Sequence, residues 1–200
     1  YYRVQNGERP DTLANKLYKD PTLYWTFFLV NENLQDFSNW PKSNSLLKRF
    51  IDRKYPGTAL IGSSSADIVS YNHDTNISSK FLLGEKVSIS NGAFGFITKV
   101  DPTFNRIIIN SVDGSFANDF VVTGEKSNKS FTISSVSLEK VVTRHYLDSN
   151  DLLTNSSSGN TPVSFEEHEI NVNNDKELIR YILPEYVDRV ASEFKELMKD

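Results

Sequence analysis

Apolar residues near the start of the chain follow the pattern of a strand and then a helix. A short alternation of apolar and polar residues at 2–5 indicates a half-buried strand, which Asn6-Gly7 ends. In the segment that follows, we expect Asp11 or Thr12 to cap a helix, because their side-chain oxygens accept the free amide hydrogens of a first turn. The apolar residues that share one face of this helix are Leu13, Ala14 and Leu17.

A second helix is predicted directly after Asp20-Pro21. The Asp side chain suits the N-cap position, and the proline ring already has the φ angle of a first helical turn. This helix is apolar around most of its circumference, so we expect other parts of the protein to cover it on more than one side. Its apolar residues are Leu23, Phe27 and Val30 on one stripe, widened by Trp25, Phe28 and Leu29.

The helical period returns at 45–55, where Pro56-Gly57 ends a third predicted helix. Its expected buried face consists of Leu46, Leu47, Phe50 and Ile51. Together the first three helices and the strand make a predicted N-terminal module over residues 1–57. Residues 58–79 contain serine and polar clusters around a short apolar stretch, so we interpret them as a connector.

The pattern changes from helical to alternating over residues 80–147. Short strands are predicted at 86–90, 94–100, 106–112, 120–122 and 130–136. Asn91-Gly92 and Asp113-Gly114 between them are typical of hairpin turns. Strands of this length and spacing predict a small antiparallel barrel or sandwich.

The last part of the chain is predicted to be a loop, a strand and a helix. Residues 148–164 have the composition of a flexible surface loop, and 165–200 form a C-terminal segment with a strand at 168–172 and a helix from Pro184. One seam of this helix is apolar at steps of three and four, as in helices that pack on another helix. The seam residues are Leu183, Val187, Val190, Phe194 and Leu197. They could contact either the chain itself or another protein.

Composition narrows the range of functions. The chain has 200 residues, a net charge of −4 and no cysteine. We therefore expect no broad basic field for nucleic acid, no disulfide, and no thiolate zinc site. No stretch approaches the length of a membrane span, and the start lacks the pattern of a signal peptide.

No motif for catalysis, a cofactor or a metal stands out. The three histidines lie far apart in sequence, and the acidic run Glu166–Glu169 around His168 reads as a solvated edge of the predicted strand. Nucleotide-binding glycine loops and serine-nucleophile motifs are absent from the sequence. We expect no enzyme activity, no catalytic residue and no cofactor, with a hydrolase built on an unmarked carboxylate pair as a third alternative.

The N-terminal module resembles a LysM-type βααβ unit, which is known for binding peptidoglycan or chitin. The residues that carry the likeness are a strand, then Gly7, Asp11-Thr12-Leu13-Ala14, a tyrosine closing the first helix, a tryptophan in the second and an Asn at its end. In more detail, the order of Pro10, Tyr18, Tyr24-Trp25, Asn31 and Trp40-Pro41 is similar to the LysM-like part of a T-even-type phage baseplate wedge protein. The segment from the predicted acidic strand through the Tyr-bearing helix has a further likeness to that family.

This resemblance implies an α+β protein of the tail baseplate, assembled in the host cytoplasm. Its partners would be other baseplate wedge and hub proteins, with no nucleic acid, membrane or small-molecule substrate. Trp40 and Pro41 lie outside the predicted helices, so we expect Trp40 to be half exposed and the pair to serve as a contact, together with the C-terminal seam. The alternative is a peptidoglycan-binding module that tethers a cell-wall enzyme.

Overall fold

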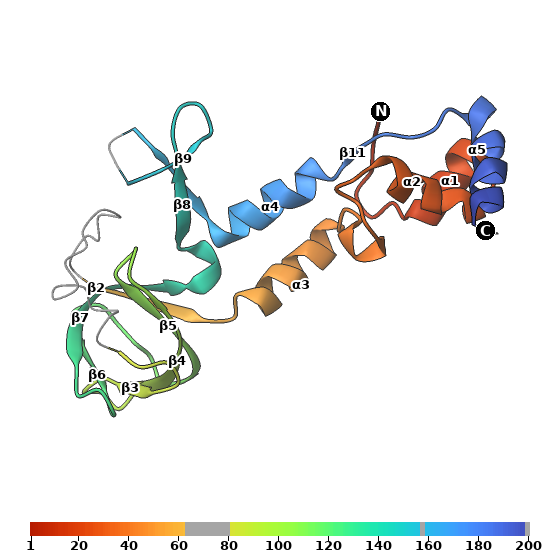
Figure 1. Ribbon diagram of the computed structural model, residues 1–200. Helices are drawn as coiled ribbons and strands as arrows, with labels where there is room; N and C mark the ends of the chain where they lie inside the picture. Colours follow the sequence, from red (N-terminus) through yellow and green to blue (C-terminus); the bar gives the residue numbers. More distant parts are fainter. Residues whose placement is uncertain (63–80, 157–158, 199–200) are drawn as a thin grey trace. The chain divides into compact units, whose positions relative to one another are not determined.

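The computed structural model describes residues 1–62, 81–156 and 159–198, and its helices and strands form two compact units. The first unit comprises Tyr1–Phe50 and Glu169–Asp200, and the second comprises Ile51–His168. The fold is therefore a mixture of helices and sheets, as predicted (Figure 1). In the described part of the chain, no helix has both the length and the apolar character that crossing a membrane requires.

The first unit contains short helices and a two-stranded sheet. Its elements are β1 (Tyr2–Arg3), α1 (Pro10–Tyr18), η1 (Pro21–Tyr24), α2 (Trp25–Val30), η2 (Phe37–Asn39), most of α3 (Asn44–Lys54), most of α4 (Phe165–Asp175), β11 (Leu178–Ile179) and α5 (Pro184–Leu197). The boundaries between the two units fall inside α3 and α4.

The helix starts in this unit follow local chemistry, with one correction. The Asp20 side chain accepts a hydrogen bond from the amide of Thr22 at 2.8 Å, as predicted for an N-cap. In contrast, α1 begins at Pro10, after Arg9, without a side-chain cap. The prediction that Asp11 or Thr12 caps this helix is wrong, because the proline ring sets the first helical turn one residue earlier.

The strand β1 pairs with a strand from the far end of the chain. Tyr2 lies opposite Ile179 and Arg3 opposite Leu178, in antiparallel register. A βααβ unit confined to the first 57 residues would need a second strand after Asn33, and the structure has η2 and α3 there. The LysM-like identity of the module is therefore not confirmed, and the strand that completes the sheet was not predicted.

The core of the first unit combines residues from both ends of the sequence. Fully buried side chains of α1 and α2 pack with Ile179 of β11, which is 0% exposed. The buried members of this core are Val4, Leu13, Ala14, Phe27, Leu34, Trp40 and Ile179. A neighbouring cluster joins Leu23 to Val187 and Ala191 of α5. Most of the C-terminal segment thus belongs to the same unit as residues 1–50.

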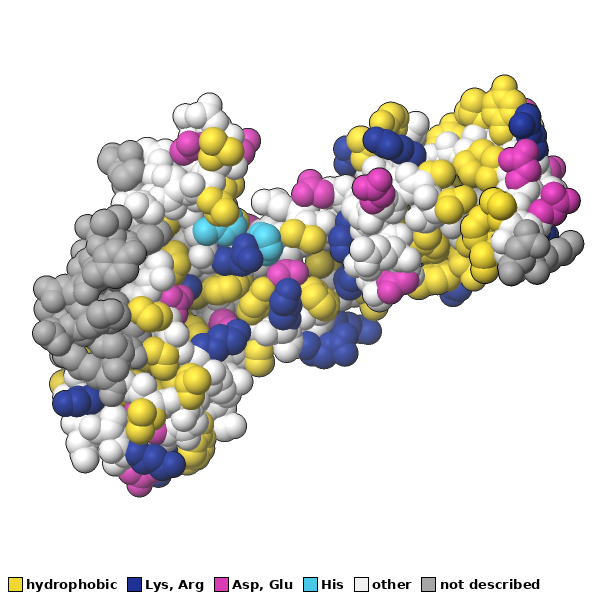
Figure 2. Space-filling model, viewed as in Figure 1, with side chains coloured by type: hydrophobic (Ala, Val, Ile, Leu, Met, Phe, Trp, Pro, Cys, Tyr) yellow, Lys and Arg dark blue, Asp and Glu magenta, His cyan; other side chains and the backbone are white. Residues whose placement is uncertain are grey.

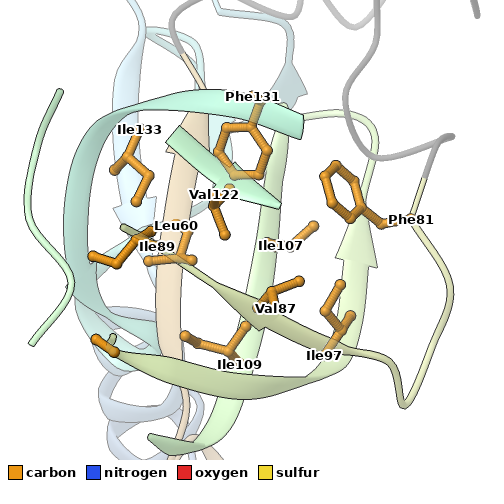
Figure 3. Packing of buried hydrophobic residues seen from close by; sticks show 11 residues of the cluster. Leu60, Phe81, Val87, Ile89, Ile97, Ile107, Ile109, Val122, Phe131 and Ile133 are labelled. Atoms are coloured by element: carbon orange, nitrogen blue, oxygen red, sulfur yellow. The ribbon is translucent and has the colours of Figure 1, made fainter. Parts of the chain in front are cut away.

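The second unit is built on a closed antiparallel barrel in the order β2-β5-β4-β3-β6-β7. The strands are β2 (Thr58–Gly62), β3 (Lys86–Ser88), β4 (Phe94–Asp101), β5 (Arg106–Asp113), β6 (Val121–Gly124) and β7 (Ser130–Leu138). The predicted alternatives were a small antiparallel barrel or a sandwich, and the structure has the barrel. Figure 3 shows the side chains of its core, including Leu60, Ile107, Ile109 and Ile133, gathered inside the strands.

The strand β2 corrects the predicted connector at 58–79. Leu60 is buried inside the barrel, whereas Ala59 is buried with Ile108 and Val142 on another cluster. A strand covered on both faces lacks the alternation of apolar and polar residues, so its short apolar run gave no strand signal. The rest of the predicted connector, 63–79, lies outside the described residues.

A three-stranded sheet includes part of the residues predicted as a loop at 148–164, namely 153–154 and 161–164. Its strands are β8 (Thr143–Leu147), β9 (Leu153–Thr154) and β10 (Thr161–Ser164), in the order β10-β8-β9, and η4 (Glu139–Val141) precedes them.

The helix α4 occupies residues predicted as a strand at 168–172. Hydrogen bonds between Ser164 and Glu167 explain why a helix begins here. The Ser164 hydroxyl accepts from the Glu167 amide at 3.1 Å and the Glu167 carboxylate accepts from the Ser164 amide at 2.8 Å, which is a capping box.

Candidate protein interface on the first unit

Trp40 belongs to the core of the first unit and Pro41 is buried, so neither is an exposed contact residue. Trp40 is 7% exposed, and its indole Nε1 donates a hydrogen bond to the Glu8 carbonyl at 2.7 Å. Its ring lies 5.9 Å from that of Phe27 and 5.9 Å from that of Phe28. Because the indole N–H has a backbone acceptor, the whole side chain can be buried. The expectation that Trp40 is half exposed is therefore wrong.

Tyr18 and Asn31, two residues that carry the resemblance, fasten the C-terminal segment to the helices. The Tyr18 hydroxyl donates to the carbonyl of Ile182 at 3.0 Å. The Asn31 amide group donates to the carbonyls of Phe27 at 2.7 Å and Arg180 at 2.8 Å, and its oxygen accepts from the Arg180 amide at 2.8 Å. The hydrogen bonds of these two side chains thus stabilise the fold of the first unit.

The helix α5 packs its central face against its own chain. Val187 is 3% exposed and packs with Leu23, and the ring of Phe194 lies 4.8 Å from that of Trp25. Of the two possibilities left open for the predicted seam, Val187 and Phe194 follow the internal one. The physical reason is that α2, which is apolar on more than one side, provides the cover through Trp25.

A second apolar row, on α5 and its N-cap residue Leu183, is left exposed beside this packed face. Leu183 is 47% exposed, Tyr186 is 55% exposed and Leu197 is 75% exposed, and Val190 between them is half-buried. These four residues are called the α5 stripe below. Tyr186 was missed by the sequence analysis, although its step of three from Leu183 and four to Val190 was a readable signal.

The surroundings of the α5 stripe are acidic. Within Pro184–Leu197 the helix has four acidic residues (Glu185, Asp188, Glu193, Glu196) and two basic ones (Arg189, Lys195). Arg189 donates to the Glu193 carboxylate at 2.9 Å, and both side chains are exposed. This hydrogen bond raises the pKa of the Arg189 guanidinium, which stays charged. Figure 2 shows hydrophobic and acidic side chains gathered around α5.

Among the described residues outside α5, few side chains are arranged as a catalytic or metal-binding site would require. His145 and His168 come together, with ring centroids 5.7 Å apart, while His73 lies outside the described residues. Burial and the charge of Arg144 lower the pKa of His145. The described residues contain no group of three or more His, Asp or Glu that could hold a metal ion. Glu169, expected on a solvated edge, is 8% exposed on α4.

A surface hollow of about 380 Å³ lies in the first unit. Its lining includes Asn31, Glu32, Leu178 and Arg180. The Asn31 amide is already bonded to the backbone at Arg180. Among the described residues that line the hollow, Glu32 is the only one with a carboxylate, so these residues form no carboxylate pair for acid and base catalysis.

Comparisons with known proteins address the N-terminal part of the chain. Residues 1–76 match the model of the family described as "Base plate wedge protein 53". The resemblance to a T-even-type baseplate wedge protein is confirmed. The baseplate wedge protein gp53 of Enterobacteria phage T4 is 32% identical over 54 residues, which are 27% of this chain and 28% of the T4 protein. The aligned part thus spans 28% of the relative's length. The helix α5 lies outside residues 1–76, which match the family.

Proposed function

We propose that this chain is a structural, non-enzymatic subunit of a phage tail baseplate, where it joins neighbouring wedge and hub proteins. The match of residues 1–76 to baseplate wedge proteins supports the location in the virion tail, after assembly in the host cytoplasm. The α5 stripe is the surface through which the first unit would bind a neighbour. The observation that carries this proposal is an apolar row on α5 that the described residues of its own chain leave exposed.

The energetics favour the α5 stripe over the other predicted contact residues. Burial of apolar surface stabilises a complex by roughly 25 cal/mol per Å², and only surface that is exposed in the free protein can contribute. Leu197 and Tyr186 therefore have much to gain, whereas Trp40 and Val187 are already buried in their own chain. Tyrosine is also common among the residues that dominate binding energy at interfaces.

Leu197→Asp and Tyr186→Asp test the proposal. Each places a charge within the α5 stripe, at a side chain that contributes little to the fold because it is more than half exposed. We expect both variants to fold normally and to be lost from assembled tails, as measured by quantitative mass spectrometry of purified particles. Ser192→Asp, which puts the same charge on an exposed position outside the stripe, is the matched control and should assemble normally.

Normal incorporation of both stripe variants would overturn the α5 stripe as the joining surface. The alternative function, peptidoglycan binding, is tested by a pull-down of the full chain on purified cell walls. The full chain is needed because Ile179 completes the core of the first unit. Strong saturable binding would contradict the structural-subunit proposal.

A further inference from the structure

The α5 stripe follows a heptad pattern in which one position is polar. From Leu183 the steps of three and four lead to 186, 190, 193 and 197. Four of these positions are the apolar members of the stripe, and the remaining one is Glu193. Side chains at such positions point toward a partner helix when two helices pack along their lengths. A helix lying on the stripe would therefore cover Glu193 as well.

We propose that the α5 stripe binds a helix of another protein that presents apolar side chains to the stripe and a Lys or Arg opposite Glu193. This inference rests on the proposed function and names the chemistry of the partner. The 14 residues of α5 span about 21 Å at 1.5 Å per residue, so the partner helix needs a similar length.

The basic residue follows from the cost of covering a carboxylate. An ionised side chain removed from water without a compensating charge or hydrogen bonds is strongly disfavoured. Arg189 donates to Oε1 of Glu193 at 2.9 Å in the free protein, and both side chains are exposed. A helix that covers Glu193 would remove the other acceptor sites of this carboxylate from water, and a partner Lys or Arg within the seam supplies hydrogen bonds to them. A single polar position of this kind also fixes the register of two packed helices.

Charge argues against a second copy of this chain as the occupant. A second α5 would bring another helix with four acidic and two basic residues, and its own Glu193, against the first. Like charges that face each other across an interface disfavour binding. A basic helix of a different protein has a charge complementary to that of α5, whereas a second α5 has the same charge.

Substitutions at Glu193 test the inference in the full chain. Glu193→Lys should reduce incorporation into tails by about tenfold or more, because it replaces an attraction by a repulsion. Glu196→Lys makes the same charge change outside the heptad positions and should incorporate normally. Glu193→Leu separates the possibilities further. Opposite a basic residue it leaves that charge unpaired and lowers incorporation, whereas opposite an apolar residue it raises incorporation.

Selection of second-site suppressors of Glu193→Lys then identifies the partner. We expect suppressors that change a Lys or Arg to an acidic residue within a helical segment of another baseplate protein. Unchanged incorporation of Glu193→Lys, improved incorporation of Glu193→Leu, or suppressors confined to this chain would overturn the inference. If Leu197→Asp is excluded from tails while Glu193→Lys is not, the inference fails and the proposed function stands.

Discussion

Ile179→Ala tests whether the two ends of the sequence form one folded unit. Ile179 is 0% exposed and lies in the core with Val4, Leu13 and Trp40. Replacing a fully buried isoleucine by alanine removes burial and leaves a cavity, which costs about 2–5 kcal/mol. For a domain of this size, each kcal/mol lowers the melting temperature by about 4–8 °C, so a decrease of about 8 °C or more is expected.

The two tryptophans of the chain make the assay selective. Trp25 and Trp40 both belong to the first unit, so intrinsic tryptophan fluorescence during urea unfolding reports on that unit. Leu178→Ala is the matched control. Leu178 neighbours Ile179 in β11 but is 52% exposed, and its loss should change the unfolding free energy by less than about 0.5 kcal/mol.

An Ile179→Ala variant with the wild-type fluorescence midpoint would refute this reasoning. It would show that the N-terminal helices and Trp40 pack without β11. The same variant should leave the barrel's unfolding unchanged, as followed by hydrogen exchange of the second unit, because Ile179 has no part in the barrel core.

Three further predictions concern the second unit. Gly57→Ala should destabilise the barrel in chemical unfolding followed by circular dichroism, since an added Cβ would overlap Ile108 Cγ2 and lie 2.8 Å from Glu139 Oε2. Burial of Glu85 acts to raise its pKa, but hydrogen bonds from backbone amides have the larger combined effect, so the pKa is lower than usual. The stability of the second unit should therefore fall as the pH drops below about 4.5. Glu85→Gln should weaken this pH dependence in acid titrations. Ser164→Ala should remove the capping box and cost about 1 kcal/mol, measured as faster amide exchange at the start of α4.

The regular elements could be predicted because their signals are local. Most strands from Lys86 to Leu138 alternate, β5 is a β-branched run, and the hairpin glycines Gly92 and Gly114 have the positive φ angles that their turns require. The helices α3 and α5 lie within a residue or two of their predicted ranges. Within α3, however, Leu46 was expected to be buried and is 54% exposed. The spacing of apolar residues predicts a helix more reliably than it predicts which of those residues are buried.

The missed elements depend on partners far away in the sequence. β11 has two residues and no period of its own, and Ile179 is buried only because β1 and Phe27 lie against it. Within α4, Ile170 and Val172 alternate with polar residues and so predict a strand, although Ser164 and Glu167 have the spacing of a capping box. Local pattern alone cannot predict β11, whereas the spacing of the capping box could have predicted α4.

The residues that carry the family resemblance are explained by the fold itself. Tyr18 and Asn31 bind the backbone of the C-terminal segment, and Trp40 binds the backbone at Glu8. Such residues would persist in any protein that keeps this core, whatever it binds. A sequence match over residues 1–76 therefore identifies the framework, while the α5 stripe, which lies outside the match, is where a choice of partner would be encoded. It follows that relatives with the same N-terminal motif can differ in their partners if their counterparts of Tyr186 and Glu193 differ.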